Sequence, residues 1–224
     1  MNLFDEIISG NLKNVKELIE NGADINQLNN NGDTPLYVAS QNGHQDVVKL
    51  LIDNGADINK ADTTYRPTPL CIASYNGHLD VVKLLIEKGA DINEADNDAC
   101  TPLYVASYNG HLDVVKYLHE KGADINQPNN NGCTPLHVAS FKGHLDVVKY
   151  LHEKGADINK ADGYGETPLY AACQEGKLDV VKYLIENVAD INKAHENGET
   201  PLLIAFQQGH LDVVKYLIEK GAKK

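Results

Sequence analysis

Residues 101–126 read TPLYVASYNGHLDVVKYLHEKGADIN, and this stretch decides the fold. Thr101 can cap the start of a helix, and Pro102 stands at the first helical position, where its missing N–H costs nothing. Gly110 interrupts the apolar pattern, which then resumes at helical spacing until Gly122. A glycine there supplies the left-handed residue that commonly ends a helix. The stretch therefore predicts a helix, a turn, a second helix and a loop that leads to the next Thr.

Three markers in this stretch recur at one spacing along the chain. Successive Thr-Pro-Leu motifs are 34 residues apart once and 33 residues apart four times, and Asp-Val-Val-Lys and Ala-Asp-Ile-Asn recur with matching steps. Because two short helices cannot bury their apolar faces alone, such repeats stack on their neighbours and share one continuous core. The Thr-Pro-Leu motifs begin at Thr34, Thr68, Thr101, Thr134, Thr167 and Thr200.

The period, the Thr-Pro-Leu-x-x-Ala core and the Gly-His pair resemble the ankyrin repeat over essentially the full chain. The resemblance implies an all-α solenoid of stacked helix-turn-helix units with β-turn finger loops. It also implies a concave groove, lined by the first helices and the fingers, that binds partner proteins. We expect a single domain over residues 1–224, made of seven units including caps: 1–33, 34–67, 68–100, 101–133, 134–166, 167–199 and 200–224.

The composition narrows the choice of partner and compartment. The net charge of −12 argues against nucleic acid and anionic membranes, which attract clustered Lys and Arg. No apolar run is long enough to span a bilayer, and the acidic N-terminus is unlike a signal peptide. We therefore expect a cytoplasmic or nuclear monomer with a protein partner and no cofactor. Cys71, Cys100, Cys133 and Cys173 contain no Cys-x-x-Cys pair, and we expect free thiols.

Two places depart from the repeat. Val188 stands where the other units have a helix-ending Gly, and a β-branched residue suits a positive φ poorly. We expect a local distortion there or a different helix ending. The last unit, from Thr200, has helices as apolar as those of an internal unit and little polar capping. Either the chain was cut from a longer protein or that end meets another surface.

Comparison of two neighbouring units locates the expected binding surface. Units 101–133 and 134–166 differ at nine of 33 positions, six of them in the finger loop and three on the first helix. In the ankyrin family this variable face is the groove. A column of aromatic residues lies at the end of the first helix, and aromatics ringed by polar groups are typical of binding hot spots. The candidate partner-binding residues are Tyr75, Asn76, Tyr108, Asn109, Phe141, Lys142, Tyr65, Asn97, Asp98, Asn130, Asn131, Tyr164 and Glu166.

Other interpretations of this surface stay open. The three rings could lie flat and cover the neighbouring repeat instead. The near-identity of two units also fits recent duplication, or an engineered or fragment module with no partner of its own. The weakly capped last unit fits an adaptor piece of a larger enzyme or effector. A second column is interpreted mainly as structural packing: Tyr37, Cys71, Tyr104, His137, Tyr170 and Leu203.

The residues predict a protein that is not an enzyme and holds no metal. Five histidines follow Gly at the start of the second helices, one per unit, too far apart to share an ion; the resemblance implies structural hydrogen bonds. No nucleophile–base set and no phosphate-binding Gly loop is present in the sequence. One hypothesis makes the protein a substrate, because a Leu-x5-Asp-Ile-Asn pattern resembles the site used by an animal asparaginyl hydroxylase. The asparagines concerned, which could equally organise the finger turns, are Asn26, Asn59, Asn93, Asn126, Asn159 and Asn192.

Overall fold

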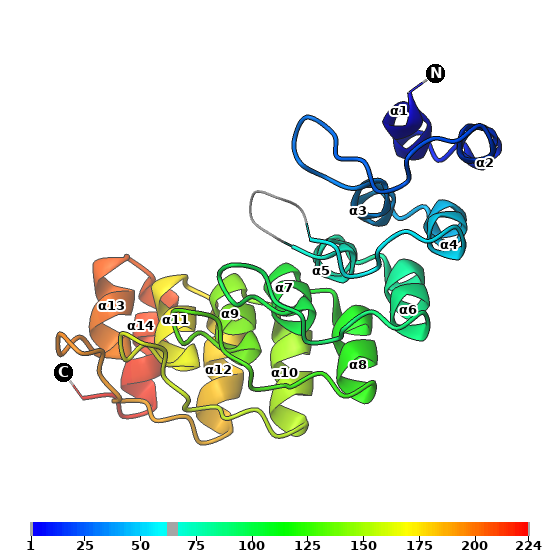
Figure 1. Ribbon diagram of the computed structural model, residues 1–224. Coiled ribbons are helices and arrows are strands. Elements are labelled where there is room, and N and C mark those ends of the chain that lie inside the picture. Colours follow the sequence, from blue (N-terminus) through cyan, green and yellow to red (C-terminus); the bar gives the residue numbers. More distant parts are fainter. Residues whose placement is uncertain (1, 62–66, 224) are drawn as a thin grey trace.

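The computed structural model describes residues 2–61 and 67–223. These residues form fourteen helices in seven successive pairs and no strands. The pairs stack side by side into an arc, with the odd-numbered helices and the finger loops on its inner side (Figure 1). The helices are α1 Leu3–Ile8, α2 Leu12–Glu20, α3 Pro35–Gln41, α4 Gln45–Asp53, α5 Pro69–Tyr75, α6 Leu79–Glu87, α7 Pro102–Asn109, α8 Leu112–Glu120, α9 Pro135–Lys142, α10 Leu145–Glu153, α11 Pro168–Gln174, α12 Leu178–Glu186, α13 Pro201–Gln207 and α14 Leu211–Glu219.

The repeated motifs fix the helix ends as the sequence predicts. Thr101 Oγ1 accepts a hydrogen bond from Tyr104 N at 3.2 Å, and Pro102 fills the first position of α7. The same cap precedes α3, α5, α9, α11 and α13. Gly122 follows α8 with a φ of +98°, a conformation that suits glycine because it has no Cβ. The all-α solenoid is confirmed.

The core runs unbroken through the stack. In the five inner pairs, from α3 to α12, each first helix contributes one fully buried Leu and each second helix contributes two Val and one Leu, as in Leu103, Val114, Val115 and Leu118. These side chains pack against their counterparts in the neighbouring pairs. Such burial stabilises by about 2 kcal/mol per large aliphatic side chain, which is the gain that stacking gives to helices too short to be stable alone.

Five of the seven second helices are preceded by a histidine that ties their pair to the pair before. The Nε2–H of His144, at the start of α10, donates to the carbonyl of Tyr108 at the end of α7, 3.1 Å away. Its ring lies over Gly110, where an added Cβ would come within 2.5 Å of Nδ1. The Gly-His pair is therefore a packing pair across the joint between repeats. The same bond joins His44 to Ile8, His78 to Gln41, His111 to Tyr75 and His210 to Gln174.

Lys177 replaces this histidine at one joint. Its aliphatic chain lies over Gly143, with Cδ 2.8 Å from the position of an added Cβ, and the imidazole bridge between α9 and α12 is absent from this part of the described chain. The α9–α10 and α11–α12 pairs are therefore joined without the polar contact that their neighbours have.

Val188 accepts the left-handed conformation instead of changing the helix ending. Its φ is +64°, and Ala189 N still donates to Leu184 O at 3.0 Å, as in the other units. The expected alternative ending is therefore wrong. The expected distortion falls on the preceding Asn187, whose ψ of 35° compares with 3° to 10° at the other second-helix ends.

Val188→Gly should stabilise the protein by about 1 kcal/mol, because the left-handed region costs a β-branched residue more than glycine loses in chain entropy. The Val188 side chain is 83% exposed, so its removal sacrifices little burial. Chemical denaturation measures the change. Gly155→Val is the matched control, since a Cβ there meets nothing within 4 Å, and it should destabilise by a similar amount. Equal stability of Val188→Gly and the wild type would contradict the strain.

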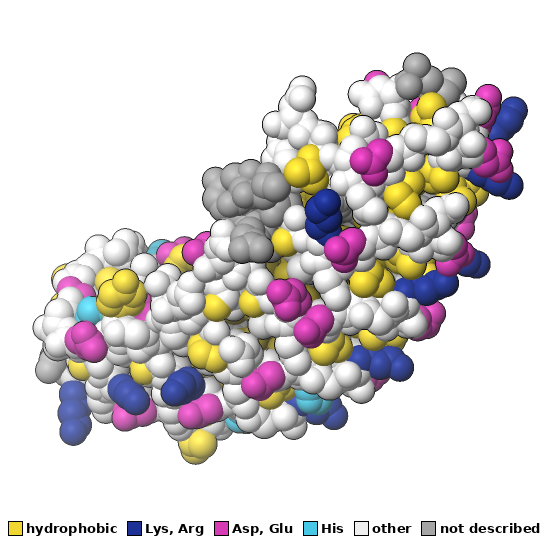
Figure 2. Space-filling view, viewed as in Figure 1, with side chains coloured by type: hydrophobic (Ala, Val, Ile, Leu, Met, Phe, Trp, Pro, Cys, Tyr) yellow, Lys and Arg dark blue, Asp and Glu magenta, His cyan; other side chains and the backbone are white. Residues whose placement is uncertain are grey.

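The outer surface and the C-terminal end differ in character. Figure 2 shows lysine and acidic side chains mixed along the outer edge made by the second helices. In one such pair, Lys88 Nζ lies 2.7 Å from Asp53 Oδ1, and this hydrogen bond between the ends of α6 and α4 lowers the pKa of Asp53.

The last helix pair has an exposed apolar surface. Phe206 on α13 is 65% exposed, and it lies beside a groove of about 540 Å³ that Leu203 and Ile218 also line. No helix in residues 2–61 and 67–223 combines the length and apolar character needed to cross a membrane.

Candidate protein-interaction surface

The three predicted aromatic residues stand at the ends of neighbouring first helices, but they differ in exposure. Tyr75 on α5 is 46% exposed, whereas Tyr108 on α7 and Phe141 on α9 are half-buried. Lys142 Nζ lies 4.3 Å from the centroid of the Tyr108 ring and 5.5 Å from that of Phe141. These distances suit a cation–π interaction with both rings. We expected a ridge of three exposed rings. The structure has one exposed ring, that of Tyr75, next to two rings that a lysine partly covers.

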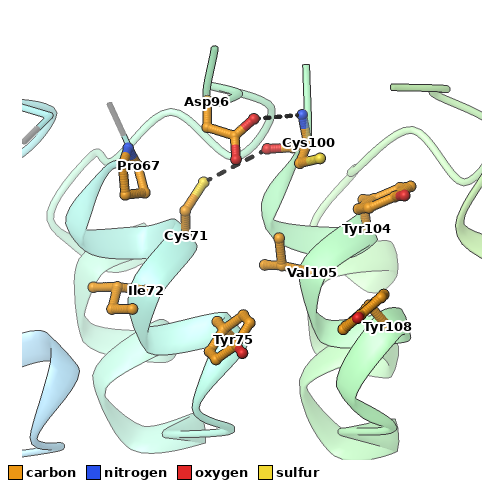
Figure 3. Close-up of a pocket in the computed structure, with 9 residues that line it drawn as sticks. All are labelled: Pro67, Cys71, Ile72, Tyr75, Asp96, Cys100, Tyr104, Val105 and Tyr108. Carbon is orange, nitrogen blue, oxygen red and sulfur yellow. Dashed lines mark hydrogen bonds between the residues drawn. The ribbon is translucent and has the colours of Figure 1, made fainter. Parts of the chain in front are cut away.

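A groove of about 370 Å³ separates α5 from α7 beside Tyr75 (Figure 3). Tyr75 and Tyr108 face it from one end, and Asp96 lies at the other. Asp96 Oδ1 accepts from Cys100 N at 2.9 Å, which folds the finger over the groove. The remaining walls are mostly apolar, so the groove can hold an apolar side chain. The lining residues are Pro67, Cys71, Ile72, Tyr75, Asp96, Cys100, Tyr104, Val105 and Tyr108.

The asparagines beside the aromatic column serve the helix ends. The Nδ2 group of Asn76 donates to Ile72 O at 3.0 Å, and that of Asn109 donates to Val105 O at 2.9 Å. Both side chains are half-buried. Part of each amide is therefore committed to closing the last turn, which leaves less of it for a partner than the sequence suggests.

The finger loops form a row of polar tips on the same side of the molecule. Asn97, Asp98, Asn130, Asn131 and Tyr164 are exposed, and the neighbouring Glu166 is half-buried. Adjacent tips are linked, since Asn130 donates from N to Asp98 O and from Nδ2 to Asn97 O, both at 2.9 Å. Backbone bonds from residue 163 to Asn131 and from residue 196 to Tyr164 continue the row. Tyr65, the remaining predicted contact, lies outside the described residues.

The asparagines of the hydroxylation hypothesis connect successive repeats. Asn26 Oδ1 accepts from Asp57 N at 3.1 Å, while the finger turn itself is closed by Asp24 Oδ1, which accepts from Asn26 N. The Asp two residues earlier thus makes the side-chain hydrogen bond that we expected from the asparagine in its own finger turn. Modification of these residues stays a prediction, and an enzyme would have to break the bond between repeats. The other bonds join Asn59 to Asp91, Asn93 to Asp124, Asn126 to Asp157, Asn159 to Asp190 and Asn192 to Lys223.

The second column is buried in the stack, as a packing role requires, except at Leu203, which is exposed at the last pair. Tyr104 OH accepts from Asn129 Nδ2 at 3.1 Å, and Tyr170 OH donates to Glu199 at 3.2 Å. Burial raises the pKa of the Cys71 thiol to about 11, so it is protonated at neutral pH and is a poor nucleophile. The four cysteines are free thiols.

Some features of the surface depend on neighbouring repeats and were missed in the sequence. The groove between α5 and α7 and the lysine over two rings both need the distance between adjacent first helices. A further cluster brings Cys133, His137 and Asp162 together, although 29 residues separate its ends. The sequence did hold one signal for this cluster: His137 and Asp162 stand at two of the nine positions where units 101–133 and 134–166 differ.

Comparison with known protein families gives matches over nearly the entire chain. The family model described as ankyrin repeats (3 copies) matches residues 3–96, 93–162 and 160–224. The matched segments overlap at their ends and together include every helix pair described above.

Curated relatives match over a shorter stretch. Protein phosphatase 1 regulatory subunit 27 from Mus musculus and Homo sapiens is 44% identical over 45 residues, which is 20% of this chain and 29% of the relative. The Notch-regulated ankyrin repeat-containing protein of Xenopus tropicalis is also 44% identical over 45 residues, 40% of its length. The chain thus spans less than half of the length of these relatives.

Among solved structures, the human ASB11 ankyrin repeat domain superimposes with a TM-score of 0.90 at 27% sequence identity. The match covers 100% of this chain and 99% of that one. The number and stacking of the helix pairs are therefore shared along the full solenoid.

Proposed function

Because this chain belongs to the ankyrin-repeat family, whose domains are generally protein-interaction modules and typically non-catalytic, we propose that it binds a partner protein through its concave face. The contact surface consists of the first helices α5, α7 and α9 and the finger loops beside them. The partner carries an apolar side chain that enters the groove between α5 and α7, with polar groups that meet the finger tips.

The observation that carries this proposal is the exposed ring of Tyr75 at the mouth of an apolar groove. A large aromatic side chain left half in water beside an apolar recess gains free energy when a partner covers both. The polar finger tips with their exposed Asn and Asp side chains supply the rim that such hot spots usually have.

Replacing Tyr75 and Tyr164 together with alanine should weaken partner binding at least about tenfold, since aromatic hot-spot residues contribute more than about 1 kcal/mol each. Both side chains are exposed, so the free energy of unfolding should stay nearly unchanged. The full chain serves as bait in affinity capture from its source cells, and the dissociation constant of each captured protein is then measured against wild type and variant.

Glu87→Ala with Glu120→Ala provides the matched control, because both glutamates are exposed on second helices. This variant should bind as tightly as the wild type. If it weakens binding as much as the concave variant does, the concave face is not the binding surface. If the bait captures nothing beyond an empty column, the chain is a module without a partner of its own.

A further inference from the structure

Cys133, His137 and Asp162 meet at the base of two neighbouring fingers. Cys133 ends the finger before α9, His137 lies in the first turn of α9, and Asp162 belongs to the next finger. One ligand atom from each lies within 4.8 Å of the other two, and Cys133 Sγ donates to Asp162 Oδ2 at 3.6 Å. The five histidines that precede second helices are too far apart to share a metal ion, and none of them belongs to this cluster.

His137 lacks the polar partner that its burial demands. The side chain is 5% exposed, and neither Nδ1 nor Nε2 has a hydrogen-bond partner among the described residues. A buried polar group without a partner costs about 1–3 kcal/mol, and a bound ion is one explanation for such a group. The tyrosines one repeat away on either side, Tyr104 and Tyr170, both use their hydroxyl groups in hydrogen bonds.

Backbone contacts already hold the other two side chains in place. Asp162 Oδ1 accepts from the backbone N of Tyr164 and of Glu166, both at 2.9 Å, which leaves Oδ2 directed at Cys133. Cys133 N in turn donates to Asn129 Oδ1 at 3.0 Å. Ligands fixed by such outer hydrogen bonds lose less freedom when a metal binds.

We propose that Cys133, His137 and Asp162 form a binding site for a zinc ion. Thiolate, imidazole and carboxylate are the three ligand types that zinc takes in proteins. Bonds of about 2.3 Å to sulfur and 2.1 Å to oxygen at tetrahedral angles place S and O about 3.6 Å apart, which matches the separation of Cys133 and Asp162. Zinc replaces the Cys133 thiol proton, which leaves to solvent. Cys133 and Asp162 are half-exposed, so a water can fill the fourth position.

The preceding repeat has the same arrangement but lacks two of the three ligands. Cys100, Tyr104 and Asn129 stand 33 residues ahead of Cys133, His137 and Asp162, and there the tyrosine and the asparagine bond to each other. The chain thus provides its own reference: the thiol position is shared, and only the His and Asp are peculiar to the proposed site.

Cobalt(II), which takes the same ligands as zinc and absorbs light when bound to thiolate, is the probe for the full chain under reducing conditions. Titration should give a thiolate charge-transfer band that saturates at one ion per chain and disappears when zinc is added. Zinc alone should raise the melting temperature, because it binds the folded state. Absence of a saturable band in the wild type would overturn the proposal.

The double variant His137→Tyr with Asp162→Asn copies the Cys100 arrangement, which this fold already accommodates, and keeps every thiol. It should lose the cobalt band and the melting shift, with affinity at least about 100-fold weaker after loss of two ligands. Cys133→Ser should lose the band as well, while Cys100→Ser should keep it. A band that persists in the double variant, or that vanishes in Cys100→Ser, would place the metal elsewhere and overturn the assignment. Circular dichroism verifies that each variant is folded.

Discussion

Gly110→Ala should lower the free energy of unfolding by about 3 kcal/mol, because the alanine suffers two separate penalties. The φ of +78° places it in the left-handed region, which costs about 1 kcal/mol net relative to glycine. Its methyl group would also lie 2.5 Å from His144 Nδ1, so the ring must move and its hydrogen bond to Tyr108 O must stretch. Displacing a packed side chain adds about 2 kcal/mol.

Gly122→Ala separates the two penalties. This glycine has a φ of +98° but nothing within 4 Å of an added Cβ, so only the backbone term of about 1 kcal/mol remains. Urea denaturation of both variants beside the wild type gives the comparison. If the two substitutions cost the same, the imidazole does not hold the joint between repeats as described.

Leu118→Ala should cost about 3 kcal/mol, the usual loss when a fully buried leucine is truncated. Leu118 is 0% exposed in the middle of α8, between neighbours on both sides. Because a solenoid is stabilised mainly by contacts between adjacent units, a defect at its centre weakens two joints at once. The main unfolding transition should therefore move to lower denaturant concentration.

Leu217→Ala makes the same chemical change at the last pair. Leu217 is also 0% exposed, but its pair, α13–α14, has a neighbouring pair on one side only, α11–α12. The pair α13–α14 should then open by itself, visible as fast hydrogen exchange confined to those helices, while the main transition moves little. An equal shift of the main transition in both variants would mean that the stack unfolds as a single unit.

Most of the fold could be predicted from the sequence because each local signal has a local cause. Thr34 and its five equivalents cap helices through their own neighbours, and the glycines act through their own φ. The features that escaped prediction are contacts between repeats. The half-burial of Tyr108 depends on Lys142 one repeat on, and Asn26 turned out to bond to the next repeat instead of its own turn. The repeat period of the sequence shows which positions are equivalent, but it does not show which residues of neighbouring repeats contact each other.

Lys177 leaves the joint between the α9–α10 and α11–α12 pairs without the imidazole bond that crosses the other joints. At the other joints between helix pairs an imidazole bond crosses from one repeat to the next, and between α9–α10 and α11–α12 it is missing. When a load is applied to the two ends of such a stack, every joint carries the same force, so the softest one extends first. At this joint the force falls on the buried core, on the hydrogen bond of 2.7 Å from Gly163 N to Asn131 O, and on the contact of His152 with Tyr183 OH, because no imidazole shares the load.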